Sequence, residues 1–290
     1  MKNKIRIAIL GGDARYLEMT KKLAENNHFE LEVVGFDQLN EGFFGVKQTD
    51  LEDLSVEELD AVILPVTGID EDGKINAVFS NQKIHLSTDW FERLSKHVVM
   101  FTGISTPYLA EQIATHGLKL IPLMNRDDVA IYNAVPTTEG AIMLAIQHTN
   151  FTIHDANVFV LGLGRVGMTV ANKFNGLGAN VFVGARKASD LARVNEMGLN
   201  GFHLDEITTY TESCDILINT IPASIVTSDV LKTIKSNALI IDLASKPGGV
   251  DFAYAKKRGI TAIHALGLPG RVAPKTAGEI LAKVINQCIL

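Results

Sequence analysis

The sequence is poor in cysteine, with only Cys214 and Cys288 among its 290 residues. It contains no CxxC motif and no Cys/His spacing of the kind that holds zinc. Neither a disulfide framework nor a structural metal is indicated, and we expect no metal site.

Long apolar runs are also missing. No uninterrupted apolar segment approaches the roughly 20 residues that a membrane helix requires. The apolar run near the N-terminus is only about a strand long and meets Gly11 and Gly12 rather than a cleavage site, so it predicts a first strand and not a signal peptide. We therefore expect a cytoplasmic protein with no membrane partner.

An excess of positive charge is absent too, because the formal net charge is -6. Binding to nucleic acid or to anionic membranes needs clustered basic surface, so we expect no nucleic acid partner. The length allows two domains, and 47% hydrophobic residues can form sizeable cores. Small-molecule chemistry fits this composition best.

What the sequence does contain is a strand, a glycine turn, a helix and a second strand within residues 157–187. The turn reads Gly162-Leu163-Gly164-Arg165-Val166-Gly167. In dinucleotide sites the first glycine makes a tight turn, the second lets backbone amides approach a pyrophosphate, and the third lets the helix pack on the strand. The alternative is a glycine turn that only connects strand to helix. Both strands and the spacing favour a dinucleotide site, with phosphates at the helix N-terminus.

The end of the second strand lacks an acid. NAD-specific sites place Asp or Glu about 20 residues after the glycines, to bind the ribose 2′-hydroxyl. Here the strand ends in Gly184 and Ala185, and Arg186, Lys187 and Ser189 follow. Cationic side chains suit a 2′-phosphate, although a solvated basic loop would look the same. We predict NADP as the cofactor.

The alternation of apolar strands and helices predicts an α/β protein with two doubly wound, Rossmann-like parallel-sheet domains and an interdomain cleft. Residues 1–125 form the substrate-side domain and 126–150 a linker helix. Residues 151–275 form the NADP-binding domain and 276–290 a C-terminal helix. In the linker, Asp127 and Asp128 predict the cap of a short helix, while Pro136 and Thr137 predict the start of a longer one.

The first domain has a turn, Gly11-Gly12-Asp13, that lacks the third glycine of the fingerprint, and we expect no dinucleotide there. Polar residues follow several of its strands. Each alone is explained by a turn or a helix cap, but as a group they could line a pocket: Asp13, Arg15, Thr67, Gly68, Thr102, Gly103, Ser105 and Thr106.

Strand ends of the second domain carry the remaining candidates. Thr220 and Pro222 follow one strand, where a polar turn usually lies along the ribose and diphosphate. Lys246 follows the next strand and is expected to project toward a nicotinamide. A histidine, His264, lies on the strand after that.

Five stretches together resemble a known family: ILGGDAR, NAVPTTEGAIMLAI, VLGLGRVG, IDLASKPGGVDF and GLPGRVAPKTAGEILA. They look like those of the dipicolinate synthase A subunits, and the resemblance covers nearly the whole chain. The last two stretches are the specific ones.

The resemblance implies an enzyme of the mother cell of sporulating bacteria. It would oxidise a cyclic hydroxytetrahydro- or dihydrodipicolinate to pyridine-2,6-dicarboxylate with NADP, accompanied by the flavoprotein-like B subunit of dipicolinate synthase. Two alternatives stay open: another NADP-dependent small-carboxylate dehydrogenase, or a non-catalytic NADP-binding subunit that supports a catalytic partner. A homo-oligomer also stays open.

A dicarboxylate substrate calls for cationic partners. Arg126, Lys246, Arg271 and Lys275 could supply them, and Lys246 is the best placed. The fold also looks like that of D-2-hydroxyacid dehydrogenases. Those enzymes carry an Arg near the position of Lys246 and a general-acid His near the later GLPG loop, where this chain has Pro269 and Gly270. We therefore assign Lys246, Arg126 and His264 as catalytic candidates, with His264 as a substitute base.

Overall fold

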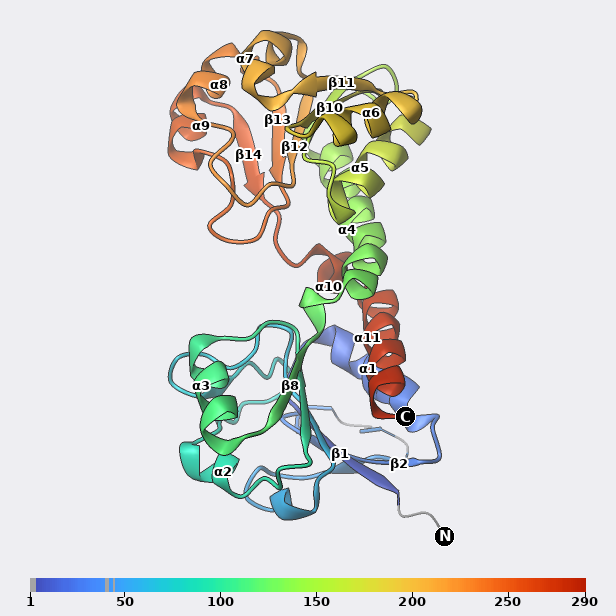
Figure 1. The fold of residues 1–290 in the computed structure, drawn as a ribbon, viewed down its shortest axis with the longest axis vertical. Coiled ribbons are helices and arrows are strands. Elements are labelled where there is room, and N and C mark those ends of the chain that lie inside the picture. Colours follow the sequence, from blue (N-terminus) through green and yellow to red (C-terminus); the bar gives the residue numbers. More distant parts are fainter. Residues whose placement is uncertain (1–3, 40–41, 44) are drawn as a thin grey trace. The chain divides into compact units, whose positions relative to one another are not determined.

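The computed structural model describes residues 4–39, 42, 43 and 45–290. The chain divides into two compact units (Figure 1). Unit 1 comprises Met1–Ala130 and Ala273–Leu290, and unit 2 comprises Ile131–Val272.

Unit 1 is built on a six-stranded parallel sheet in the order β3-β2-β1-β4-β7-β8. Its strands are β1 (Ile5–Leu10), β2 (Phe29–Val34), β3 (Lys47–Gln48), β4 (Ala61–Ile63), β7 (Val99–Thr102) and β8 (Lys119–Pro122). A short antiparallel pair, β5 (Lys74–Ile75) and β6 (Ile84–His85), stands apart from it. The helices are α1 (Ala14–Ala24), α2 (Thr88–Glu92) and α3 (Pro107–His116), with 3-10 turns η1 (Val56–Glu58) and η2 (Leu123–Asn125).

Unit 2 repeats this plan with the sheet order β11-β10-β9-β12-β13-β14. Its strands are β9 (Asn157–Leu161), β10 (Asn180–Ala185), β11 (Asn200–His203), β12 (Ile216–Asn219), β13 (Leu239–Asp242) and β14 (Thr261–His264). The helices are α5 (Arg165–Gly176), α6 (Ala188–Glu196), α7 (Ile207–Tyr210), α8 (Ser228–Thr233), α9 (Phe252–Arg258) and α10 (Leu268–Val272), with η3 (Leu204–Glu206) and η4 (Thr211–Ser213). Two parallel, doubly wound sheets confirm the predicted fold class.

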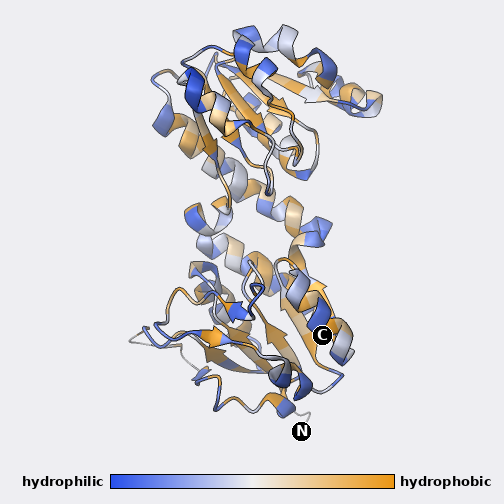
Figure 2. Ribbon diagram, turned by 90° about the vertical axis from the view of Figure 1, so that its left-hand side faces the viewer, coloured by the Kyte–Doolittle hydropathy of each residue, from blue (hydrophilic) through white to orange (hydrophobic). Residues whose placement is uncertain are grey.

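Both sheets are covered on both faces, which is why their strands read as continuous apolar runs. In β1, Ile7 and Ile9 pack into one core cluster while Ala8 and Leu10 pack into another. The strands are the most hydrophobic parts of each unit in Figure 2. Strand order reverses between β1 and β4 in unit 1 and between β9 and β12 in unit 2, and such reversals mark the ligand sites of open α/β sheets.

The linker forms one helix, α4 (Asp127–His148), so the prediction of a short helix followed by a second one starting at Pro136 is wrong. Pro136 lies inside the helix and has no N–H to donate. The hydroxyls of Thr137 and Thr138 instead donate to the carbonyl oxygens of Asn133 and Ala134, both at 2.7 Å. Such bonds from a Thr hydroxyl to the carbonyl four residues earlier tend to bend a helix, and α4 continues through the proline.

By length and composition alone α4 is the one helix of the described residues that passes the test for a membrane span. A buried helix of a globular unit passes the same test. Ala141, Leu144 and Ala145 of α4 pack into the core of unit 2, while Ile131 and Ile146 of the same helix are exposed.

The last helix, α11 (Pro274–Ile289), packs on α1 within unit 1. The contact is close because Gly278 has no side chain: a Cβ there would lie 2.3 Å from the carbonyl oxygen of Arg15. Leu281, Val284 and Ile285 of α11 join the core that also holds Met19 of α1. The chain thus completes the first sheet's cover with its last helix.

Candidate functional site

The glycine turn after β9 has the geometry that the fingerprint predicts. Gly162 has φ +95°, and a Cβ there would lie 2.7 Å from the hydroxyl oxygen of Thr220. A Cβ on Gly167 would lie 2.0 Å from the carbonyl oxygen of Gly162. These two glycines are therefore required by close packing of turn, helix and neighbouring strand.

Gly164 differs from the other two glycines. It is exposed, and a Cβ there would meet no atom of the described residues within 4 Å. It is the N-cap of α5 and, as a glycine, has no side chain with which to cap the helix. The first amides of α5, at Arg165, Val166 and Gly167, therefore face a space in which backbone can approach a phosphate group. These residues fit a dinucleotide.

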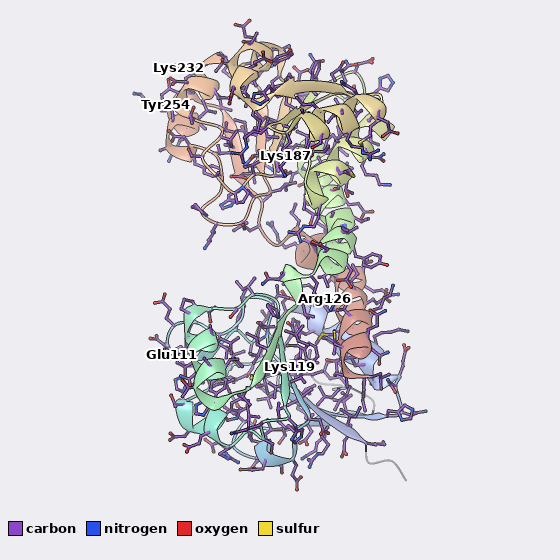
Figure 3. All side chains as sticks on the ribbon, in the orientation of Figure 1. Glu111, Lys119, Arg126, Lys187, Lys232 and Tyr254 are labelled. Atoms are coloured by element: carbon purple, nitrogen blue, oxygen red, sulfur yellow. The ribbon has the colours of Figure 1, made fainter. Side chains whose placement is uncertain are left out.

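The end of β10 lies beside this turn, because Gly162 N donates to the carbonyl oxygen of Gly184 at 2.8 Å. Arg186, Lys187 and Ser189 are exposed here, and Lys187 is the N-cap of α6 without a side-chain cap (Figure 3). Within the described part of the chain, no carboxylate lies within 4.0 Å of the Arg186 or Lys187 side chain. Two cations thus stand where the second ribose of a dinucleotide would lie.

The neighbouring strand β12 adds Thr220, whose hydroxyl donates to the carbonyl oxygen of Leu161 at 2.7 Å, and the exposed Pro222. The structure therefore brings all of the predicted cofactor residues to the carboxyl edge of one sheet.

A pairing that was missed from the sequence joins Asn219, the first residue of the polar turn at the end of β12, to Asp242. They end β12 and β13, are register partners, and are fully buried. Asn219 Nδ2 donates to Asp242 Oδ1 at 2.8 Å. In the sequence they resemble ordinary turn residues, and the available signal was a polar residue at the same position of two adjacent strands.

Lys246 and His264 lie near this pair. Lys246 is exposed in the loop after β13. His264 is partly buried, and its Nε2 donates to the carbonyl oxygen of Ala244 at 3.1 Å while its ring lies 5.5 Å from that of Phe252. Because a carbonyl only accepts, Nε2 carries a hydrogen and Nδ1 is the nitrogen that can take a proton.

Arg126 belongs to unit 1, whereas Lys246 and His264 belong to unit 2. Arg126 Nε and Nη2 donate to the two carboxylate oxygens of Asp128 at 3.0 and 2.9 Å. These hydrogen bonds raise the pKa of Arg126 and lower that of Asp128. Its Nη1 also lies 3.6 Å from Cys288 Sγ. Arg271 and Lys275 are exposed.

The strand ends of unit 1 form a pocket, lined partly by predicted residues: Thr67, Gly68 and Thr106. Beside it, Gly12 N donates to the carbonyl oxygen of Asn76 at 2.8 Å. The amide that a diphosphate would use is thus bonded within the protein. Arg15 donates to Asp13 through Nε and Nη2. Burial acts to raise the pKa of Asp13, but these contacts with Arg15 hold it below its usual value.

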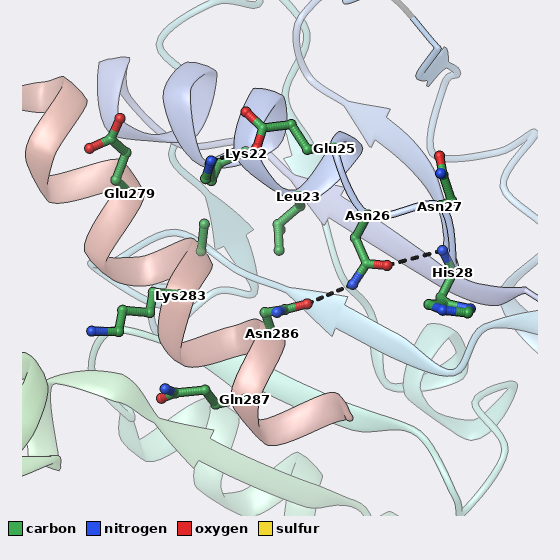
Figure 4. Close-up of a pocket in the computed structure, with 11 residues that line it drawn as sticks. Lys22, Leu23, Glu25, Asn26, Asn27, His28, Glu279, Lys283, Asn286 and Gln287 are labelled. Atoms are coloured by element: carbon green, nitrogen blue, oxygen red, sulfur yellow. Dashed lines mark hydrogen bonds and ion pairs between the residues drawn. The ribbon is translucent and has the colours of Figure 1, made fainter.

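A groove between α1 and α11 lies at the opposite, amino edge of the unit 1 sheet (Figure 4). Asn26 Nδ2 donates to Asn286 Oδ1 across it at 2.7 Å. Open parallel sheets bind ligands at the carboxyl edge, so this groove is not the cleft expected for a substrate. Among the residues described here, no cluster of His, Cys, Asp and Glu could hold a metal ion.

Comparisons with known proteins identify the class of this site. Residues 130–290 match the family model for the alanine dehydrogenase/PNT C-terminal domain. The chain therefore carries a dehydrogenase-type domain, which implies a nicotinamide cofactor and an oxidoreductase.

Residues 6–124 match the model for the N-terminal domain of the dipicolinate synthase A subunit. The A subunit of dipicolinate synthase from Bacillus subtilis (strain 168) is 50% identical over 98% of this chain and 96% of the relative. The crystal structure of its Bacillus halodurans counterpart has a TM-score of 0.96 at 49% identity, covering 100% of this chain and 99% of that one. The chain belongs to the family of dipicolinate synthase A subunits, as the sequence motifs predicted.

A third relative matches only part of the chain. Shikimate dehydrogenase (NADP(+)) of Pyrococcus furiosus is 28% identical over 136 residues, 45% of this chain and 49% of the relative. The first two relatives are named as an A subunit, which implies that a second subunit belongs to their enzyme.

Proposed function

We propose that this chain oxidises a cyclic hydroxytetrahydro- or dihydrodipicolinate to pyridine-2,6-dicarboxylate with NADP. The observation that carries the proposal is the uncapped N-terminus of α5 behind Gly164, next to strand-end loops that present Thr220 and Lys246. Membership in the family of dipicolinate synthase A subunits supports the choice of substrate.

The preference for NADP over NAD rests on the end of β10. Arg186, Lys187 and Ser189 stand where an NAD-specific site places an acid. Arg binds phosphate bidentately and Lys as a point charge. The partial match to a relative named for NADP(+) supports the same choice.

When bound, a nicotinamide cofactor supplies the hydride acceptor for this oxidation. Converting a dihydropyridine into the aromatic ring removes one hydride and one proton, and a hydroxytetrahydropyridine must first lose one molecule of water. We assign Lys246 to bind a substrate carboxylate and His264 Nδ1 to take the proton. Arg126 would release Asp128 and bind the second carboxylate of the substrate in its place. Its guanidinium would then be paired with a carboxylate both before and after the substrate binds.

We place this reaction in the cytoplasm of the mother cell of a sporulating bacterium, with the flavoprotein-like B subunit of dipicolinate synthase as partner. The naming of the relatives as an A subunit supports a partner. Co-purification of the tagged chain from sporulating cells tests this setting.

The experiment for the activity mixes purified protein with NADP and freshly generated cyclic substrate. We expect the absorbance of a pyridine dicarboxylate to rise together with NADPH. Product that appears only after a second subunit is added would instead mark this chain as a supporting NADP-binding subunit. Turnover of other small carboxylates in preference to this substrate would favour a different dehydrogenase.

A further inference from the structure

The geometry points to Asp242 and Asn219 as a positioning pair that fixes the Lys246 loop against the loop after β12. The inference deepens the proposed function and rests on it in one respect, namely that Lys246 contacts the substrate. Neither side chain reaches solvent, so both act through the loops that they hold.

Asp242 is bonded to three donors from three places. Its Oδ1 accepts from Asn219 Nδ2 at 2.8 Å and from Ala244 N at 3.1 Å, and its Oδ2 accepts from Gly249 N at 2.7 Å. The loop of Lys246 is therefore bonded to one carboxyl group at both of its ends. Ala244 is held a second time, by His264.

Asn219 extends this bonding to the other loop. Its Nδ2 also donates to the carbonyl oxygen of Ile221 at 3.0 Å, and its Oδ1 accepts from Ile221 N at 3.1 Å. The turn that carries Thr220 and Pro222 is thus shaped by the same side chain that binds Asp242.

Gly249 makes the contact between the loops close. A Cβ there would lie 2.4 Å from Asn219 Nδ2 and 2.6 Å from the carbonyl oxygen of Ala223. The Gly249 carbonyl accepts from Val226 N at 2.8 Å. The two loops therefore form one hydrogen-bonded body, and an exposed lysine projects from it.

A buried carboxyl group is costly unless hydrogen bonds compensate it, and apolar replacement of buried ionic groups is often neutral or stabilising. Within the described residues, no Lys, Arg or His nitrogen lies within 4.0 Å of Asp242. The hydrogen bonds of Asp242 are made with backbone amides of the loop and with Asn219, as expected for a side chain that fixes the conformation of a loop. Placement matters because an error of about 1 Å at a reacting centre can cost about 10²-fold in rate.

The test compares Asp242→Asn with Asp251→Asn. Asn at 242 offers one acceptor oxygen in place of two, so either Ala244 or Gly249 loses its bond. We expect kcat to fall by about 10²-fold, as in Lys246→Ala, while the Kd for NADP changes by less than about threefold. Hydrogen exchange should accelerate at whichever of the two amides, Ala244 or Gly249, loses its bond. Asp251 caps α9 through Tyr254 N, and Asn caps equally well, so the control should match wild type.

A second variant, Gly249→Ala, covers the case in which Asp242→Asn does not fold. It forces the loops apart while leaving Asp242 unchanged, so we expect the same loss of kcat, together with weaker NADP binding because the turn of Thr220 and Pro222 shifts as well. Wild-type kcat in either folded variant, or exchange in Asp242→Asn that is unchanged at both Ala244 and Gly249, would overturn the inference. If the wild-type protein itself makes no product, the proposed function fails, while hydrogen exchange and NADP binding still test the loop bonding.

Discussion

At the scale of a single residue, we expect Arg186 to determine the preference for NADP over NAD. Its guanidinium is exposed at the end of β10 with no carboxylate paired to it in the described chain. Charge-assisted hydrogen bonds contribute about 1.5–3 kcal/mol. Arg186→Ala should therefore raise the Kd for NADP by about 10- to 100-fold and leave the Kd for NAD nearly unchanged, measured by calorimetric titration of both cofactors.

Arg193→Ala provides the matched control, because Arg193 lies on α6 and its Nη1 pairs with Glu196 at 2.8 Å. It should bind both cofactors as wild type does. Equal losses for NADP and NAD in Arg186→Ala would contradict the assignment of a 2′-phosphate site.

Glu32 is a buried charge whose effect on stability depends on pH. It lies on β2 and accepts from Arg6 Nη2 at 2.9 Å and from Lys47 Nζ at 2.8 Å. Burial acts to raise the pKa of Glu32, but the hydrogen bonds and charges of Lys47 and Arg6 together lower it by more. The folded-state pKa of Glu32 therefore lies below the ordinary value. The stabilisation is then complete above the unfolded-state pKa and is lost as the pH falls through the folded-state pKa.

Glu32→Gln should lower the free energy of unfolding by about 1.5–3 kcal/mol near neutral pH. The difference from wild type should shrink in acid, below the ordinary Glu pKa of about 4.3. Urea unfolding at several pH values measures both, and exposed Glu30→Gln on the same strand is the control. A destabilisation that is equal at all pH values would argue against the ion pairs as its source.

At the scale of an element, the turn from β9 into α5 assigns different tasks to its glycines. Gly164→Ala adds a methyl group in open space, so we expect an unchanged melting temperature and weakened cofactor binding. Gly167→Ala would place Cβ 2.0 Å from a carbonyl oxygen, so both melting temperature and binding should fall. Thermal unfolding and NADP titration of the two variants measure the split. If Gly164→Ala binds the cofactor as tightly as the wild-type protein does, the assignment of a phosphate site to this turn would be wrong.

Elements whose residues follow one local rule were predictable. The apolar run near the N-terminus was predicted as a first strand, and β1 confirms it, because a strand covered on both faces reads as an unbroken apolar run. α4 was divided wrongly because Pro is favoured in the first turn of a helix, and the sequence does not reveal that this helix continues through Pro136. The Asn219–Asp242 pair depends on strand register, which joins residues far apart in the chain. The glycine turn was predicted correctly because all of its residues are adjacent in the sequence.

On the scale of the whole molecule, the two units have separate cores. The clusters around Val158 and Phe159 lie in unit 2, and those around Ile7 and Ala8 lie in unit 1. A ligand that binds one folded unit stabilises it by about 2.7 kcal/mol at 100 times its Kd. NADP should therefore slow hydrogen exchange chiefly in β9, β10, β12 and β13. Protection of β1 and β4 to the same extent would place the cofactor elsewhere, and the protein without cofactor is the reference.

The placement of α11 in unit 1 also has a consequence for how the chain is made. Unit 2 is continuous in sequence, whereas unit 1 takes its final helix from residues that follow the whole of unit 2. A ribosome therefore releases everything that unit 2 needs before it releases the helix that covers Met19 and Leu23 of α1. Unit 1 is therefore synthesised first but completes its core last. Until α11 is released, the apolar surface of α1 that it covers is exposed, and this is the surface that a chaperone would bind.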